Sequence, residues 1–436
     1  MNLVRRLAAR ALTSNALRDA RRTGARARRL TRGGKRAVQF FWQVDDPYAA
    51  VALPFVVRLA RAHGLALEAR LVPPPDAAAA PEAALLAAYA RRDSAALAAA
   101  LGLPPVAAVP PAEAVVATAE RVAAQALVQA APPETLLAIA QAMVAADPAA
   151  ALAPLAAALG KASPAATARA LAHGAAARAS AGHYLGSVTH FEGEFYWGID
   201  RLHYLEARLA GDAALCPRLD PVMPPVAALE GPAPVLDFYL SFRSPYTMVA
   251  AERIGALAAH YGATLNLRFV LPMVMRGLPV PGAKRRYITL DTKREAARFG
   301  LPFGDIVDPV GLGVERGLAV LHHAIAAGRG LDFARAFLTG AFARGIDMTG
   351  DALFAVAAGA GIGAEAVRAA LADDSWRTVA EENRTALFAL GLWGVPSFQV
   401  AGRAPHWGQD RLWAVEDDLR TVRGLPPIDR RVPCEG

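Results

Sequence analysis

Three short motifs in the second half of the chain carry residues that could do chemistry. Ser244-Pro245 opens an expected helix, Val395-Pro396 precedes a short strand, and Asp410 stands at the start of the last helix. Taken singly, each has a plain structural explanation, because Ser before Pro is an ordinary helix start and Asp is a common helix cap. Their occurrence together favours a functional site, in which a hydroxyl at the positive end of a helix could stabilise an anion such as a thiolate.

Other motifs do not support a binding site. The segment from Gly277 to Arg285 resembles a phosphate-binding loop, but it has Ala before the Lys and Arg where Ser or Thr must hold magnesium. The glycines between 359 and 363 lie between helices, so a turn is favoured over a dinucleotide site. His322 and His323 are neighbours that face about 100° apart on a helix. We therefore expect no metal site.

The elements that must position these motifs follow a recognisable order. The pattern predicts a strand, a helix and a second strand, then a long helical stretch, a strand pair and a closing helix, at 235–242, 246–260, 264–271, 284–390, 397–406 and from Asp410. A β-α-β half, a helical insertion and a β-β-α half form the plan of a thioredoxin fold with an inserted helical domain. The predicted fold class is α/β.

The first half repeats this plan. Residues 37–51 align without gaps on 235–249, and the WGIDRL segment from Trp197 matches WGQDRL from Trp407. We predict two tandem thioredoxin-like domains, each with a helical insertion. The predicted organisation is a basic arm, a first domain, a stiff Pro-rich linker, a second domain and a tail, at 1–36, 37–210, 211–234, 235–422 and 423–436.

Four ordered segments of the second half carry a family resemblance. DFYLSFRSPYTMVAAERI, AKRRYITLDTKREAARFGLPF, GLWGVPSF and HWGQDRLWAVE resemble the 2-hydroxychromene-2-carboxylate isomerase and kappa-class glutathione transferase family, which has a DsbA-like thioredoxin fold. The resemblance implies glutathione as cofactor. It places Ser244 at the glutathione sulfur, Val395 and a cis Pro396 at the cysteinyl backbone, and Gln409 and Asp410 at the γ-glutamyl end.

The implied reaction is an isomerisation of an aromatic or unsaturated acid. A thiolate adds to a conjugated double bond, the resulting single bond rotates, and the thiolate leaves. A kappa-like transferase and a non-enzymatic thioredoxin-fold binding module are the alternatives. A DsbA-type thiol-disulfide oxidoreductase is excluded, since Ser244-Pro245-Tyr246-Thr247 stands in place of CxxC.

The sequence also departs from the family. Residues 272–281 contain no Asn, so the acceptor pocket is rebuilt, and Lys284, Arg285 and Arg286 are candidates to meet a carboxylate or to begin a solvated helix. In the first half, Asp46 stands where Ser244 stands and would repel a thiolate. No proline lies between residues 164 and 217, so the cis-proline is absent there. We expect the first domain to be a degenerate, non-catalytic partner.

The charge distribution and the cysteine content limit which partners and which cellular compartment we expect. Residues 1–36 have a net charge of +11 and the rest of the chain −3, so the arm reads as a solvated, partly disordered tail and we expect no nucleic-acid partner. Two cysteines, Cys216 and Cys434, favour a reducing, cytoplasmic compartment. Prolines and glycines interrupt both long uncharged runs, so no integral membrane segment is predicted. The partners expected are a small-molecule substrate and, in a homodimer, a second copy; a monomeric pseudo-dimer is the alternative.

Overall fold

The computed structural model describes residues 2–209, 214–226 and 229–431 of the chain. The chain divides into two compact units. We call Met1–Asp19 with Asp220–Ile428 the C-terminal unit, and Ala20–Leu219 with Asp429–Gly436 the N-terminal unit. The C-terminal unit is therefore discontinuous in sequence and includes the start of the chain.

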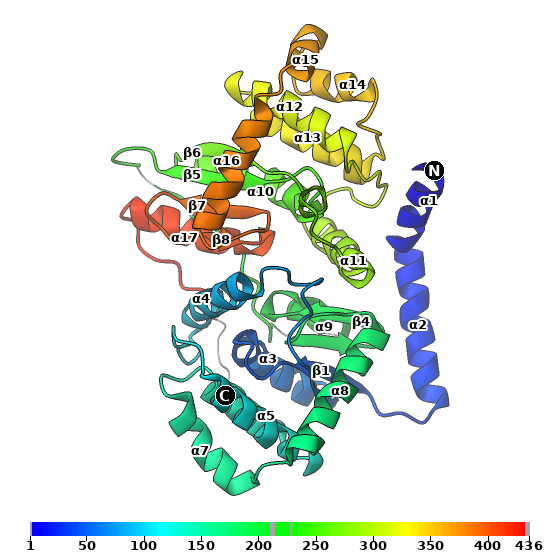
Figure 1. Ribbon diagram of the computed structural model, residues 1–436, viewed down its shortest axis with the longest axis vertical. Helices are drawn as coiled ribbons and strands as arrows, with labels where there is room; N and C mark the ends of the chain where they lie inside the picture. The colour runs from blue at the N-terminus through cyan, green and yellow to red at the C-terminus, as the bar shows by residue number, and fades with distance from the viewer. Residues whose placement is uncertain (1, 210–213, 227–228, 432–436) are drawn as a thin grey trace. The chain divides into compact units, whose positions relative to one another are not determined.

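A four-stranded mixed sheet organises the C-terminal unit, in the order β6-β5-β7-β8 (Figure 1). The first two strands are parallel and the other pairs are antiparallel. Phe238 and Leu240 of the central strand are fully buried, which follows from its place between two neighbours. The strands are β5 Val235–Leu240, β6 Thr264–Phe269, β7 Ser397–Val400 and β8 His406–Trp407.

Helices connect and cover this sheet as the sequence predicts. α10 joins the parallel strands, a helical insertion follows β6, and a 3₁₀ turn with α17 closes the unit. Phe242, after β5, stacks on Phe337 of the insertion with ring centroids 4.0 Å apart, so sheet and insertion share one core. The elements are α10 Pro245–His260, η2 Met273–Arg276, α11 Gly282–Arg298, α12 Leu312–Ala326, α13 Gly330–Ala343, α14 Ala352–Gly359, α15 Ala364–Leu371, α16 Trp376–Ala389, η3 Gln409–Arg411 and α17 Leu412–Val422.

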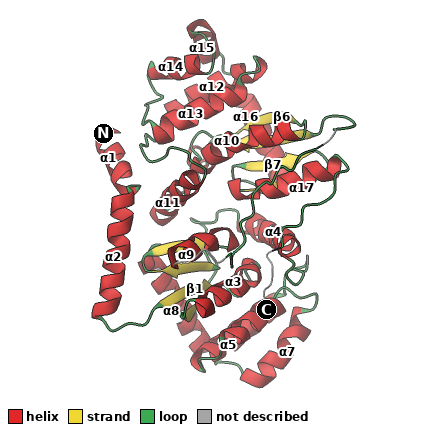
Figure 2. Ribbon diagram, turned by 180° about the vertical axis from the view of Figure 1, so that it is seen from behind, coloured by secondary structure: helices red, strands yellow, loops and turns green. Residues whose placement is uncertain are grey.

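The N-terminal unit has the same strand topology, β2-β1-β3-β4, with the same parallel and antiparallel pairs. Figure 2 draws the strands of this sheet in yellow beside the label β1. Both halves therefore have the predicted mixed α/β plan. The duplication itself stays a prediction. The elements are β1 Ala37–Trp42, α3 Tyr48–Ala62, β2 Ala66–Leu71, α4 Ala83–Leu101, α5 Glu113–Val128, α6 Pro133–Ala142, α7 Pro148–Leu159, α8 Pro164–Ala181, β3 Val188–Phe191, β4 Glu194–Trp197, η1 Ile199–Arg201 and α9 Leu202–Leu209.

A buried glutamate on each closing helix holds the connecting segment. Glu206 of α9 accepts hydrogen bonds from the backbone N–H groups of residues 215 and 216, at 2.6 and 3.1 Å. Glu416 of α17 does the same for residues 222 and 223, at 2.8 and 2.6 Å. The part of the predicted linker that the structure describes is thus divided, each side being fastened to its own unit. Residues 211–213 and 227–228 of the linker lie outside the described residues.

The N-terminal arm differs from the tail that the sequence predicts. It forms two helices, α1 Asn2–Leu12 and α2 Asn15–Thr31. In the N-terminal unit, Arg22 pairs with Glu194 at 2.9 Å and Arg29 with Glu192 at 2.8 Å. The prediction of a solvated, partly disordered tail is wrong for these residues, because acidic side chains of the body neutralise part of the arm's charge.

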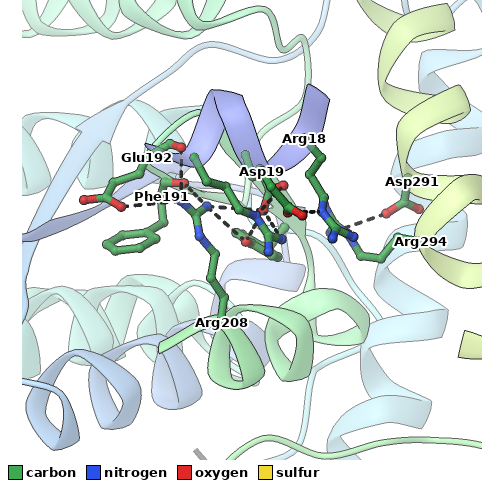
Figure 3. A network of polar contacts seen from close by, with 10 residues as sticks. Arg18, Asp19, Phe191, Glu192, Arg208, Asp291 and Arg294 are labelled. Atoms are coloured by element: carbon green, nitrogen blue, oxygen red, sulfur yellow. Dashed lines mark hydrogen bonds and ion pairs between the residues drawn. The ribbon is translucent and has the colours of Figure 1, made fainter. Parts of the chain in front are cut away.

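The β3–β4 turn that receives these arginines is itself built around Arg208 of α9. The Arg208 guanidinium donates to the Phe191 carbonyl at 2.8 Å, contacts the carboxylates of Glu192 and Glu194 at 3.4 and 3.2 Å, and lies over the Phe191 ring (Figure 3). Its side chain is 8% exposed, so these contacts compensate a nearly buried charge.

Among the described residues, no single helix combines the length and apolar character needed to cross a membrane; only α14 and α15, bent by 119°, meet that test as a pair.

Candidate functional site

Ser244 lies at the N-cap of α10, as the capping interpretation predicts. Its Oγ accepts a hydrogen bond from the Thr247 N–H at 3.2 Å, and its hydroxyl donates to the Val395 carbonyl at 3.3 Å. The hydroxyl therefore caps the helix and also contacts the second motif, 151 residues away in sequence. Its place at the positive end of α10 suits the stabilisation of an anion.

The Val395-Pro396 peptide bond is cis, as predicted from the resemblance. It lies directly before β7, whose first residue pairs with Tyr239 of β5. Two tryptophans flank it: Trp393 and Trp407 have ring centroids 4.5 Å apart. The carbonyl of the cis bond accepts from Ser244, and the aromatic pair comes from residues just before the bond and across β7 from it.

The third motif adjoins the second through one backbone hydrogen bond. The Gly408 N–H donates to the Pro396 carbonyl at 2.9 Å, which brings the 407–411 turn next to the cis bond. Asp410 follows in this turn, with 22% of its side chain exposed and the Arg411 guanidinium 3.6 Å away. Its carboxylate is therefore partly accessible to solvent, as a ligand-binding group must be.

Gln409 lies differently from what the resemblance implies. Its side chain is 1% exposed, its amide N–H donates to Glu295 at 2.6 Å, and its amide oxygen accepts from Arg253 at 3.0 Å. These contacts direct the Gln409 side chain into the unit. It holds the 3₁₀ turn in place, and Asp410 is the member of the pair that can face a ligand.

The basic residues at the start of α11 differ in their environment. Arg285 and Arg286 are exposed, whereas Lys284 is half-buried and burial lowers the pKa of its amine. Arg276 of η2 was not singled out by the sequence, yet its guanidinium donates to the Trp393 carbonyl at 3.3 Å. The segment that lacks the expected Asn therefore supplies an arginine beside the cis-proline motif.

Two further polar contacts support the Ser244 turn and were missed from the sequence. Arg243, the preceding residue, forms a two-pronged ion pair with Asp308, with distances of 2.9 and 2.8 Å. Tyr246 donates to the buried carboxylate of Asp291 at 2.8 Å. Neither pair has a local sequence signal, because both partners lie 45 or more residues away.

The N-terminal unit has different residues at the matching positions. Val188 pairs with Phe41 in the register in which Ser397 pairs with Tyr239, so Ser187 occupies the place of Pro396, with φ of 48°. Asp46 stands in the place of Ser244. Burial raises the pKa of Asp46 to about 6, and hydrogen bonds from Ser187 and the Tyr48 N–H oppose that rise. An acid thus replaces the hydroxyl in this half.

The C-terminal half matches a known domain family. Residues 235–420 match the DsbA-like thioredoxin domain, and this half of the chain is such a domain. The matched segment runs from β5 to α17, so it contains all three motifs.

The same half of the chain is similar to individual proteins. The 2-hydroxychromene-2-carboxylate isomerase of Pseudomonas putida is 25% identical in an alignment of 194 residues that covers 42% of this chain and 94% of that protein. A solved structure of a 2-hydroxychromene-2-carboxylate isomerase is 22% identical, with a TM-score of 0.38, over 43% of this chain and 95% of that one. A probable DsbA oxidoreductase from Streptomyces coelicolor is also 22% identical, with a TM-score of 0.34, over 47% and 95%.

Proposed function

We propose that the C-terminal unit, which contains a DsbA-like thioredoxin domain, is a glutathione-dependent isomerase of the 2-hydroxychromene-2-carboxylate isomerase type, acting on an aromatic or unsaturated acid. The observation that carries the proposal is the Ser244 hydroxyl, which lies at the start of α10 and contacts the Val395 carbonyl. The curated Pseudomonas putida relative, similar over 94% of its length, supports the choice of reaction.

The donor set fits glutathione at most of its groups. Ser244 offers a hydroxyl and a helix N-terminus to a sulfur anion, and the partly exposed Asp410 offers a carboxylate to an ammonium group. At the start of α11, the exposed Arg285 and Arg286 and the half-buried Lys284 are cations that could meet carboxylates. The Gln409 side chain does not fit as a ligand group, because Glu295 and Arg253 already occupy it.

The protein's part in the reaction is to favour the thiolate. Bound glutathione would supply a thiolate that adds to a conjugated double bond and leaves after rotation about the resulting single bond, with no net consumption. A free thiol has a pKa of about 8.5, so at neutral pH it is mostly protonated. Ser244 can donate its hydrogen bond to that sulfur in place of Val395, and the positive end of α10 lowers the thiol pKa further.

Thiol-disulfide exchange through the protein is not part of the proposal. The four residues that open α10 are Ser, Pro, Tyr and Thr, which cannot form a mixed disulfide. Cys216, the cysteine that the structure describes, is buried in the other unit; Cys434 lies outside the described residues. Few cysteines and a need for reduced glutathione together suit a cytoplasmic protein.

The test is glutathione calorimetry on the full chain. We expect one site, abolished in the double variant Ser244→Ala, Asp410→Ala and unchanged in Asp46→Ala. Two equivalent sites, or a site lost with Asp46, would contradict the assignment to the C-terminal unit. Isomerisation of an unsaturated aromatic acid should leave the glutathione concentration unchanged, whereas its stoichiometric consumption would identify a transferase.

A further inference from the structure

The first helix of the chain packs on the loop between α11 and α12, which we call the 299–311 loop. The Arg6 guanidinium contacts both carboxylate oxygens of Asp305, with Nη2 2.6 Å from Oδ2, and it also donates to the Arg344 carbonyl at 3.3 Å. These hydrogen bonds hold the pKa of Asp305 below its usual range. All of these residues belong to the C-terminal unit.

Two glycines allow this close approach. A Cβ atom on Gly304 would lie 2.4 Å from Thr13 Oγ1, and one on Gly345 would lie 2.4 Å from Arg6 Nε. Both glycines have positive φ, 127° and 61°, which disfavours any other residue. Thr13 is buried, and its hydroxyl lies 3.4 Å from the Gly304 carbonyl. The close packing of α1 therefore requires glycine at both positions, one facing Thr13 and one facing Arg6.

The same loop reaches the candidate site three residues later. Asp308 accepts from Arg243 Nε at 2.9 Å and from Arg243 Nη2 at 2.8 Å, and Arg243 directly precedes Ser244. The loop backbone is also fixed just before Asp305 and just before Asp308, because the N–H groups of Gly304 and Val307 donate to carbonyls of α13 at 2.9 Å. A continuous series of contacts thus runs from Arg6 to the residue beside Ser244.

We propose that α1 helps to position the Ser244 hydroxyl of the candidate site. Arg6 and Thr13 hold the 299–311 loop in place. Asp308 on that loop holds Arg243, the residue before Ser244. The proposal rests on the proposed function, but it assigns the basic arm a role that the sequence did not suggest. Arg6, Asp308 and Arg243 are positioning residues, since each is argued to act on Ser244 through another residue or through the backbone.

The first test measures glutathione on the full-length protein. In Arg6→Gln we expect the Kd to rise at least about threefold and the pKa of the bound thiol to rise, in line with the coupling that positioning networks carry. Arg6→Lys, which keeps the charge, should recover part of the loss. Leu7→Gln is the matched control, because Leu7 is 53% exposed on the same helix. Equal effects of Arg6→Gln and Leu7→Gln would overturn the proposal.

A double-mutant cycle tests the path itself. Arg6→Gln and Asp308→Asn should be less than additive in the Kd for glutathione, because each breaks the same series of contacts. Full additivity would overturn the proposal.

The last measurement does not depend on glutathione. Amide hydrogen exchange in Arg6→Gln should accelerate at Gly304 and Val307 and also at Ser244, whose N–H is bonded to the Ser241 carbonyl at 3.0 Å. Acceleration confined to the loop would overturn the coupling. If the wild-type protein fails to bind glutathione, the proposed function fails, while this exchange pattern still decides whether α1 supports the Ser244 turn.

Discussion

Tyr48 and Tyr246 make the same hydrogen bond in the two halves of the chain. The Tyr246 hydroxyl donates to Asp291 at 2.8 Å, the Tyr48 hydroxyl donates to Asp93 at 2.6 Å, and in each pair 45 residues separate the tyrosine from the aspartate. Each bond joins the helix that follows the first strand, α3 or α10, to the first long helix of the insertion, α4 or α11. Because the pair persists where Ser244 is replaced by Asp46, its role is structural.

Removing these hydroxyls should destabilise both units. Asp93 also accepts a hydrogen bond from Tyr89 at 3.2 Å, and Asp291 also lies 3.8 Å from the Arg294 guanidinium. Urea denaturation should show that Tyr246→Phe and Tyr48→Phe each lower the free energy of unfolding of their unit by about 1.5 to 3 kcal/mol, because a carboxylate loses a hydrogen bond. An unchanged free energy of unfolding in either variant would contradict this structural role.

Ser244→Ala should separate the chemical role of the hydroxyl from its capping role. We expect the pKa of the bound glutathione thiol to rise by about one unit, since one hydrogen bond to the anion is lost. Ultraviolet titration of the thiolate measures it. Ser163→Ala is the control, because Ser163 caps α8 with the same 3.2 Å bond to a backbone N–H. Both changes should cost about 1 kcal/mol of stability. An unchanged thiol pKa in Ser244→Ala would leave that residue as a cap alone.

Asp46 should make the N-terminal unit less stable at neutral pH than at mildly acidic pH. Its pKa is about 6 in the folded protein, above the ordinary value of 3.8, because burial disfavours the charged form. The stabilising contribution is therefore complete below pH 3.8 and is lost as the pH rises through 6. The loss is about 3 kcal/mol.

The measurement is the free energy of unfolding of wild type and Asp46→Asn between pH 4 and 8. The difference between the two proteins should shift in favour of Asp46→Asn as the pH rises, and other titrating groups cancel in this comparison. A difference that stays constant over this range would show that Asp46 titrates normally.

Cys216 should resist alkylation in the folded protein. It is 4% exposed, and burial together with Glu206 raises the pKa of its thiol far above the ordinary value. With iodoacetamide at pH 8, peptide mapping should find Cys216 labelled at less than about a tenth of the rate in denatured protein, because the thiolate is the reacting form. Rapid labelling of the native chain would show that the segment held by Glu206 opens readily.

Much of the fold could be predicted because its signals are local. Apolar runs predicted β5 and β6, Ser244-Pro245 marked the start of α10, and the family motif predicted the cis bond before Pro396. The helical insertions followed from periodicity and from glycines at their breaks. Each of these features depends on a few consecutive residues.

The remaining features depend on partners far apart in the chain. Arg6 and Asp305 are 299 residues apart in sequence, and Arg243 and Asp308 are 65 residues apart. Neither ion pair can therefore be predicted from a single segment. The inward direction of Gln409 depends on Arg253 and Glu295 from two other helices. A basic arm looks solvated in sequence because its acidic partners are scattered over the rest of the chain.

The discontinuity of the C-terminal unit also fixes an order of assembly during synthesis. Asp305 is synthesised 299 residues after Arg6, which at roughly 5 to 20 residues per second is about 15 to 60 s of translation. An eleven-residue helix is marginal in water by itself, so α1 gains its lasting structure only when the 299–311 loop emerges. Helix α1 is thus made long before its native contacts can form, and a chain that ends before the 299–311 loop cannot complete the support of the Ser244 turn.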